Sequence, residues 1–231
     1  LQPARWPETV TTEWEPAKTA PAAPAAAYVV DTLKLPDPNP WNVPVFIGGF
    51  DFFEDGRAAL CTFHGDVFIV DGLPSKPHSG EAANPGLRPS TLDFRPLQWR
   101  RVASGLYHAL GLKVVKGEIY VTCRDGIYRL KDLNGDGETD FYEVFNNDIK
   151  VTKNFHEFVF DLHTDSDGYF YFAKAGPVKN GGRGVDQIMS HHGTLLRVSP
   201  SGKSMEVMAT GFRAPNGIGI GPNGEMTSGD N

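Results

Sequence analysis

The chain has 231 residues, of which 40% are hydrophobic and 22% charged, and its formal net charge is −6. Its 15 Phe, 7 Tyr and 4 Trp supply enough apolar surface for a core, which excludes disorder over most of the length. An acidic chain without a Lys/Arg run argues against a nucleic-acid partner, and no apolar stretch approaches the roughly 20 residues that cross a bilayer.

The first 27 residues differ in composition from the rest. Residues 16–27 form a Pro/Ala-rich spacer of semi-extended character. The chain opens at Leu1 without a Met or a signal sequence, as expected of a mature exported protein or of a fragment of a longer chain. We therefore expect residues 1–27 to form a strap or linker outside a folded domain at 28–231.

From about residue 44 a repeated pattern of strand, glycine-containing turn and strand runs along the chain. The turn glycines are Gly56, Gly117, Gly168 and Gly224, spaced at roughly the 40–60 residues of a propeller blade. The pattern predicts an all-β fold, a β-propeller with about four blades present, and a β-sandwich is the alternative. The fourth unit ends one hairpin into its blade, so we expect further chain or a second chain to supply the remaining blades.

The two cysteines, Cys61 and Cys123, form neither a CxxC pair nor a CxxCH haem-attachment motif. Both fall in predicted strands. Two buried thiols are favoured over one disulfide, because cysteine is among the most buried residue types.

One acidic segment matches the spacing of a calcium-binding loop, D-x-[DN]-x-[DN]-G-x5-E. Gly137 would allow the sharp turn, and calcium prefers oxygen ligands of this kind. The alternative is an acidic hairpin turn that holds no ion. The predicted ligands are the side chains of Asp132, Asn134 and Asp136, the carbonyl of Glu138, Asp140 directly or through water, and Glu143 with both oxygens.

Polar residues precede three of the predicted inner strands. They are His108 in YHALG, His156 in NFHEF, and Arg213 with Asn216 in GFRAPNG. Loops that enter the inner strands of a propeller converge on one face, so we expect these side chains around one channel mouth. A histidine there can act as a general base, although channel-lining residues without catalysis would look the same.

A histidine pair, His191-His192, follows a glycine-rich loop at 176–184. A mobile loop that ends in two imidazoles could complete a metal site. The alternative is a solvated surface pair.

Several long strings resemble one bacterial group of proteins. They include DFFEDGRAALCTFHGDVFIV, GLYHALGLKVVKGEIYVTCRDGIYRLKDLNGDGETDFYEVFNND and ATGFRAPNGIGIGPNGEMTSGDN. The group consists of large secreted proteins described as membrane-bound dehydrogenases or haem-binding proteins. Their propeller is similar to the glucose/sorbosone dehydrogenases that use pyrroloquinoline quinone (PQQ). The resemblance implies a six-bladed ring, a periplasmic or extracellular location, and haem c on another part of the full protein.

The resemblance also implies roles for individual residues. His156 falls where the sugar dehydrogenases carry their general base. Arg213 falls at the quinone-contacting Arg of an RNP-x-G string. The aligned positions of His108 and Asn216 make them further predicted cofactor contacts. The string departs from the pattern at Ala214, where the family has Asn.

The favoured function is thus the propeller part of an exported quinoprotein-like dehydrogenase. It would oxidise a sugar or alcohol and pass electrons to a cytochrome-type acceptor. The alternative is a calcium-stabilised binding or scaffolding propeller without catalysis. A third hypothesis is a metal-dependent enzyme that uses His108, His156 and His191 or His192.

Overall fold

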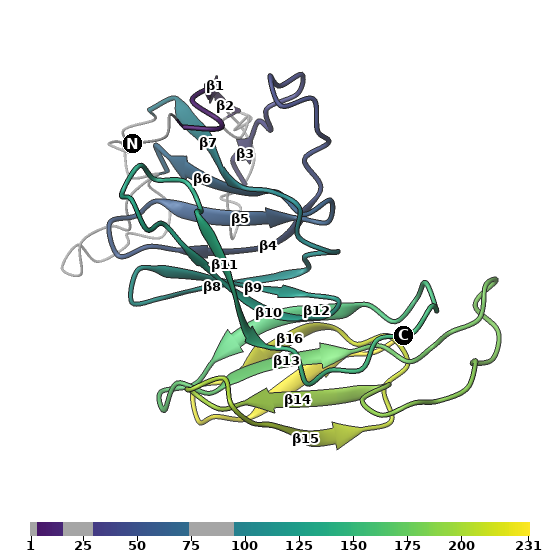
Figure 1. The fold of residues 1–231 in the computed structure, drawn as a ribbon. Helices are drawn as coiled ribbons and strands as arrows, with labels where there is room; N and C mark the ends of the chain where they lie inside the picture. Colours follow the sequence, from purple (N-terminus) through teal and green to yellow (C-terminus); the bar gives the residue numbers. More distant parts are fainter. Residues whose placement is uncertain (1–3, 16–29, 74–94) are drawn as a thin grey trace, which may run out of the picture.

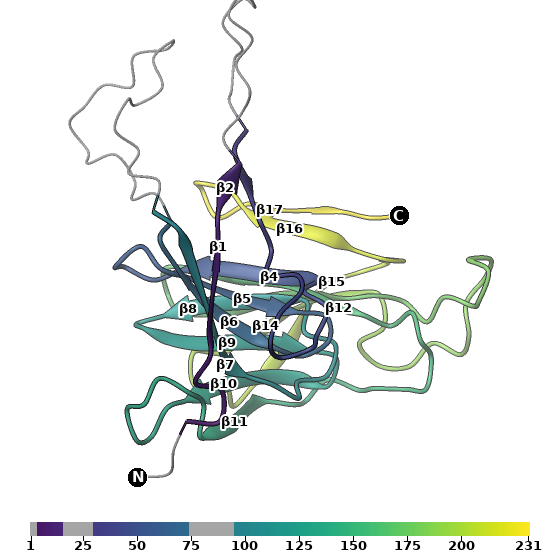
Figure 2. The ribbon, with the colours of Figure 1, turned by 90° about the horizontal axis from the view of Figure 1, so that it is seen from above.

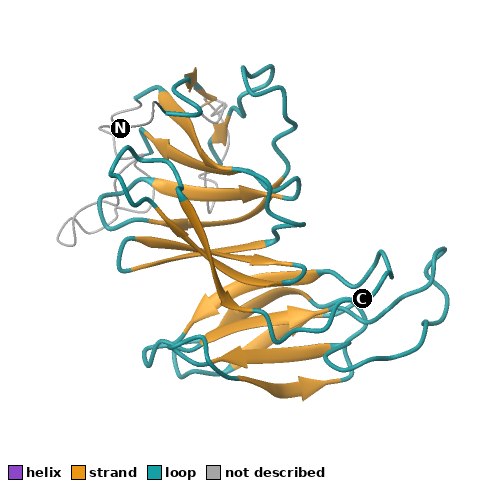
Figure 3. Ribbon diagram, viewed as in Figure 1, coloured by secondary structure: helices purple, strands orange, loops and turns teal. Residues whose placement is uncertain are grey.

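The computed structural model describes residues 4–15, 30–73 and 95–231. These residues form strands, turns and no helix (Figure 3). Among them there is accordingly no helix of the length and apolarity needed to cross a membrane.

Most strands belong to three antiparallel sheets and a C-terminal hairpin, which we call the first, second and third blades and the fourth-blade hairpin. Within each blade the strands follow one another from the inner edge outward. The first blade contains β4 (Ile47–Phe52), β5 (Ala58–Thr62), β6 (Val67–Asp71) and β7 (Leu97–Ala103). The second contains β8 (Gly111–Val115), β9 (Glu118–Cys123), β10 (Gly126–Lys131) and β11 (Phe141–Asn146). The third contains β12 (Val159–Thr164), β13 (Phe170–Lys174), β14 (Thr194–Val198) and β15 (Met205–Thr210), and the hairpin contains β16 (Asn216–Ile220) and β17 (Met226–Gly229).

The inner strands β4, β8, β12 and β16 lie side by side, each in contact with the next (Figure 1). Glycine permits this approach, because a β-carbon on Gly111 would lie 2.3 Å from the backbone of Asp161. The four turn glycines identified in the sequence all have positive φ, between 81° and 91°. This arrangement confirms the all-β propeller-type fold, as an open ring of sheets.

Apolar side chains fill the spaces between blades. One cluster joins the first and second blades through Val67, Leu112 and Val121, and another joins the second and third through Ile127 and Leu196. Cys61 and Cys123 belong to the first cluster and are buried free thiols, which confirms the preference for two thiols.

The N-terminal segment differs in part from the expected strap. β1 (Thr9–Thr12) pairs antiparallel with β7 and becomes the fifth, outermost strand of the first blade (Figures 1 and 2). The indole Nε1–H of Trp99 donates to Thr12 Oγ1 at 2.8 Å. A short pair, β2 (Trp14–Glu15) with β3 (Thr32–Leu33), follows it. The Pro/Ala-rich spacer lies outside the described residues.

Candidate functional site

The residues singled out before the inner strands lie at one end of the blades, which we call the loop end. Here the inner strands begin, and the β5–β6, β9–β10 and β13–β14 connections turn, the last projecting on the right of Figure 1. His108, His156 and Arg213 each lie three residues before the first residue of β8, β12 and β16 respectively. They therefore occupy equivalent positions of successive blades.

His156 is held by hydrogen bonds on both its backbone and its ring. Its backbone N–H donates to Asn154 Oδ1 at 2.8 Å, and its Nδ1 lies 3.0 Å from the carbonyl oxygen of Val178. Because a carbonyl only accepts, Nδ1 carries the proton of the neutral ring. The Nε2 atom of this half-buried side chain then has a free lone pair, as a general base requires.

A buried cluster of charged groups lies beside His156, formed by Arg124, Glu157 and Lys174, and His192 hydrogen-bonds to it. Glu157 and Lys174 have fully buried side chains. Glu157 accepts from Arg124 Nη2 at 3.3 Å and from His192 Nε2, and Lys174 Nζ lies 3.7 Å from its second oxygen. Arg124 also donates to the carbonyl oxygens of Thr152 and Asn154, so the cluster ties the β11–β12 loop to the core.

The cluster keeps the Glu157 carboxylate charged. Burial would raise the pKa of Glu157, but hydrogen bonds from Thr152 and His192 and the charge of Lys174 together lower it. Burial lowers the pKa of the Lys174 ammonium to about 8, against the attraction of Glu157. Lys174 therefore loses its proton more readily than an exposed lysine does.

His108 has a different environment from His156. Its ring stacks on Phe63 with centroids 4.5 Å apart and planes 13° apart. Burial, followed by the charge of Arg124 and by His64, lowers its pKa, which favours a neutral imidazole. Its Nδ1 is buried and has no hydrogen-bond partner among the described residues.

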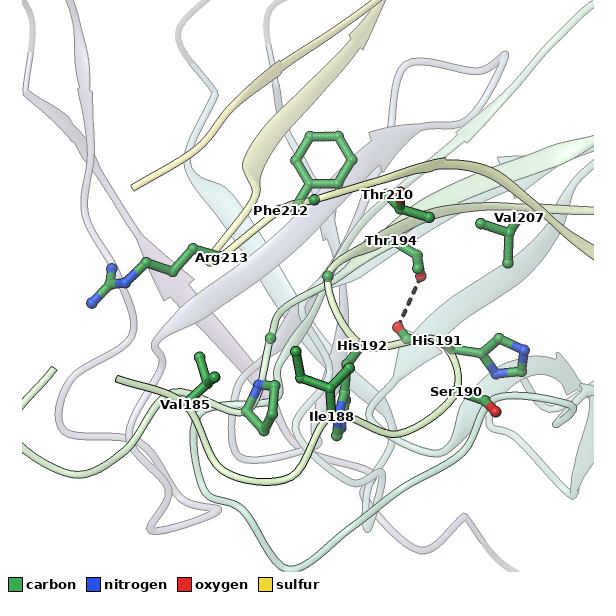
Figure 4. A pocket seen from close by; sticks show the side chains of 14 residues that line it. Val185, Ile188, Ser190, His191, His192, Thr194, Val207, Thr210, Phe212 and Arg213 are labelled. Atoms are coloured by element: carbon green, nitrogen blue, oxygen red, sulfur yellow. Dashed lines mark hydrogen bonds between the residues drawn. The ribbon is translucent and has the colours of Figure 1, made fainter. Parts of the chain in front are cut away.

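The Arg213 guanidinium donates hydrogen bonds to two backbone carbonyl oxygens. Nη1 donates to Asn231 and Nη2 to Gly182, at 3.0 and 2.8 Å, and the guanidinium points away from the other side chains drawn in Figure 4. Asn216 is exposed at the start of β16, opposite Gly229. Two of the five guanidinium N–H donors are thus occupied, and the contact of Arg213 with a quinone stays a prediction.

The adjacent residues His191 and His192 lie in two different environments. His192 is buried, accepts at Nδ1 from the Met189 N–H at 3.0 Å and donates from Nε2 to Glu157. His191 lines a pocket of about 800 Å³ beside Phe212 (Figure 4). Within the described ranges no three His, Cys, Asp or Glu residues are grouped to hold one metal ion. The structure thus gives the metal-dependent hypothesis no site built from His108, His156 and His191 or His192.

The acidic loop lies at the opposite end of the second blade, between β10 and β11. Asp132 accepts the N–H groups of Gly135 and Gly137, each at 2.7 Å, and Asp136 accepts that of Glu138. Asn134 Nδ2 donates to Asp136 and to Asp140. These side chains are calcium ligands by type, but no three carboxylates of the described residues are grouped to hold one ion.

One carboxylate of the predicted calcium site, that of Glu143, is engaged elsewhere; the Glu138 carboxylate is engaged too, but only the Glu138 carbonyl is a predicted ligand. Glu143 points from β11 to Lys131 and Arg129, with Nζ–Oε2 2.9 Å and Nη1–Oε2 3.6 Å. The Glu138 carboxylate is buried and accepts the N–H groups of Arg5 and Trp6 at 2.7 Å. Glu143 could bind calcium only after breaking its ion pairs with Lys131 and Arg129. Calcium binding by this loop stays a prediction.

One further residue was not identified from the sequence. Asp161, in the inner strand β12, has φ +61°, a conformation rarely adopted by residues other than glycine. Its N–H donates to Leu110 of the second blade, and its carboxylate accepts the N–H groups of Gly217 and Ile218 at 3.0 and 2.8 Å. It therefore links three successive blades.

No family model matches the chain, and no curated protein matches it. Solved structures do. A gluconolactonase from Xanthomonas campestris is 16% identical with a TM-score of 0.58, covering 96% of this chain and 67% of that one. An oxidoreductase of Thermus thermophilus, described as a glucose dehydrogenase, is 17% identical with a TM-score of 0.51, covering 80% and 58%.

A third neighbour is the PQQ domain of a pyranose dehydrogenase from Coprinopsis cinerea, in its holo form. It is 11% identical with a TM-score of 0.52, covering 80% of this chain and 43% of that domain. The chain thus spans between 43% and 67% of the length of these three structures. At such identities the likeness concerns the architecture, and it shows that this chain has a β-propeller fold.

Proposed function

We propose that the chain is the propeller part of an enzyme that acts on a sugar, with His156 as the general base. The observation that carries the proposal is the contact between His156 Nδ1 and the Val178 carbonyl, which leaves Nε2 free to accept a proton. The names of the structural neighbours, a gluconolactonase and two sugar dehydrogenases, support a sugar as substrate.

Such a base serves two reactions. In oxidation, Nε2 takes the hydroxyl proton of the sugar while the hydride leaves for an oxidant. In lactone opening, Nε2 takes a proton from the attacking water, and the imidazolium returns it to the ring oxygen as the C–O bond breaks. The second reaction consumes only lactone and water.

The finer proposal, drawn from the sequence resemblance, is a PQQ-dependent oxidation of a sugar or alcohol. It includes a c-type cytochrome acceptor, haem on another part of the full protein, and a periplasmic or extracellular location. In this proposal the N–H groups of Arg213 that have no partner among the described residues would hold the quinone, which would supply the oxidant for the hydride. The calcium-stabilised binding propeller is the competing proposal.

The test measures both reactions on the full chain. Glucose oxidation is followed with an artificial acceptor after addition of PQQ and calcium, and opening of glucono-1,5-lactone is followed by acid release. His156→Ala should lower turnover by about two to four orders of magnitude, with a smaller effect on affinity. His163→Ala, a histidine toward the other end of β12, is the matched control. Absence of both activities would favour the binding propeller.

A further inference from the structure

An aromatic residue immediately precedes each of the three equivalent polar residues at the loop end. Tyr107 precedes His108, Phe155 precedes His156 and Phe212 precedes Arg213. The pairs lie four and three residues before the inner strands β8, β12 and β16. Successive blades therefore present an aromatic ring beside an imidazole or a guanidinium at the same level.

Two of these aromatic rings are exposed although large aromatic side chains fill the core elsewhere. Tyr107 is 46% exposed and Phe155 is 58% exposed. The Phe155 ring lies 5.4 Å from the His156 ring and 6.5 Å from the His108 ring, and Tyr107 lies 4.4 Å from His108. Two aromatic and two imidazole rings thus adjoin one another across two blades.

Two neighbouring side chains, Phe158 and Arg124, contact these exposed rings and hold them in place. Phe158 packs edge-on against Phe155 with centroids 5.4 Å apart, and it also lies 5.9 Å from His108. The Arg124 guanidinium lies 5.7 Å from the centre of the Tyr107 ring, and its Nη1 donates to the Phe155 carbonyl at 3.5 Å. An exposed ring on a supported backbone is ready to bind a ligand with little ordering cost.

The chemistry of these two aromatic and two imidazole side chains indicates a neutral ligand. The Nε2 atom of each imidazole has no hydrogen-bond partner among the described residues, because His156 engages its ring through Nδ1 and the buried ring nitrogen of His108 is Nδ1. The nearest guanidinium, that of Arg124, is buried and paired with Glu157, so it is not available to an anion. A closed sugar ring has an apolar C–H face and a rim of hydroxyl groups, which matches aromatic faces bordered by imidazoles.

We propose that Tyr107, His108, Phe155 and His156 form a binding site for the neutral closed ring of a sugar. The apolar face of the sugar stacks on the Phe155 ring, and its hydroxyl groups hydrogen-bond to the two imidazoles. The choice of a sugar rests on the proposed function, but the stacking itself can be measured without turnover.

The experiment uses methyl β-D-glucopyranoside, which stays closed and neutral, and sodium gluconate, which is open and anionic. Saturation-transfer NMR on the full chain should show strong transfer to the axial protons of one sugar face. Gluconate should show little transfer. Equal transfer to all protons of the glucoside, or stronger binding of gluconate, would overturn the proposal.

Two variants decide whether Phe155 is the stacking ring. Phe155→Ala should weaken glucoside binding about tenfold, and Phe155→Trp should restore it. The control is Phe141→Ala, since Phe141 is 51% exposed at the opposite end of the second blade. Equal effects of Phe155→Ala and Phe141→Ala would overturn the proposal. Glucoside binding without either enzymatic activity would refute the proposed function alone, and activity without stacking would refute only this inference.

Discussion

Two loops of this protein, one at each end of the second blade, are both rich in hydrogen bonds and use them in opposite ways. In the acidic loop, side chains of Asp132 and Asp136 accept N–H groups of the same loop. In the β11–β12 loop, the backbone carbonyls of Thr152 and Asn154 are bound by Arg124, which comes from the turn between β9 and β10.

The difference concerns what remains available to a ligand. In the acidic loop, backbone N–H groups already hydrogen-bond to the carboxylate oxygens. An ion must therefore compete with these N–H groups for the same oxygen atoms. The β11–β12 loop is held by buried partners from neighbouring strands, and His156 Nε2 is left free. A short sequence motif therefore describes the first loop well, whereas the second depends on residues distant in sequence.

The largest expected effect comes from the buried carboxylate beside His156. Glu157→Gln should lower the free energy of unfolding by about 3–5 kcal/mol, because Arg124 and Lys174 lose their buried counter-charge. The matched control is Glu143→Gln, whose half-buried ion pair with Lys131 should contribute less than about 1 kcal/mol. Urea unfolding of both variants measures the difference, and similar losses would contradict the distinction between the loops.

A smaller, pH-dependent effect should come from Lys174. Its pKa of about 8 in the fold lies below the ordinary 10.5, so between these values the unfolded chain binds more protons than the folded one. The unfolding free energy contributed by this group therefore rises with pH across that window, by at most about 1.4 kcal/mol per pH unit. We expect wild type to gain stability relative to Lys174→Met from pH 8 to 10. A constant difference would show that Lys174 does not titrate there.

The smallest effect belongs to the acidic loop. Asp132→Ala removes the acceptor of two backbone N–H groups and should cost about 1 kcal/mol. Millimolar calcium should raise the melting temperature of the wild-type chain and leave that of Asp132→Ala unchanged. Calcium that stabilises both chains equally would place its binding outside this loop.

The blade pattern was predictable from the sequence because strand alternation and turn glycines are local signals. The turn glycines Gly56, Gly117, Gly168 and Gly224 indeed have the positive φ that such turns require. The alignment of His108, His156 and Arg213 before their strands followed from the same periodicity, and the structure places all three at one end of the blades.

Long-range partners were not predictable in this way. Nothing in the sequence pairs Glu157 with Arg124 or Lys174, although a lysine within the apolar run FYFAK is a signal of a buried charge. The positive φ of Asp161 depends on contacts with the two neighbouring blades. The engagement of Arg213 with Gly182 and Asn231 likewise depends on tertiary structure.

The fifth strand of the first blade also bears on solubility. Without β1, the edge of β7 would expose unpaired backbone groups beside Leu97 and Trp99, both buried in the fold. An open edge of this kind invites pairing with another chain, and thus aggregation. β1 instead presents threonines to the solvent side of the sheet. Expression vectors that trim the N-terminal segment as a dispensable tail would therefore yield a chain that self-associates.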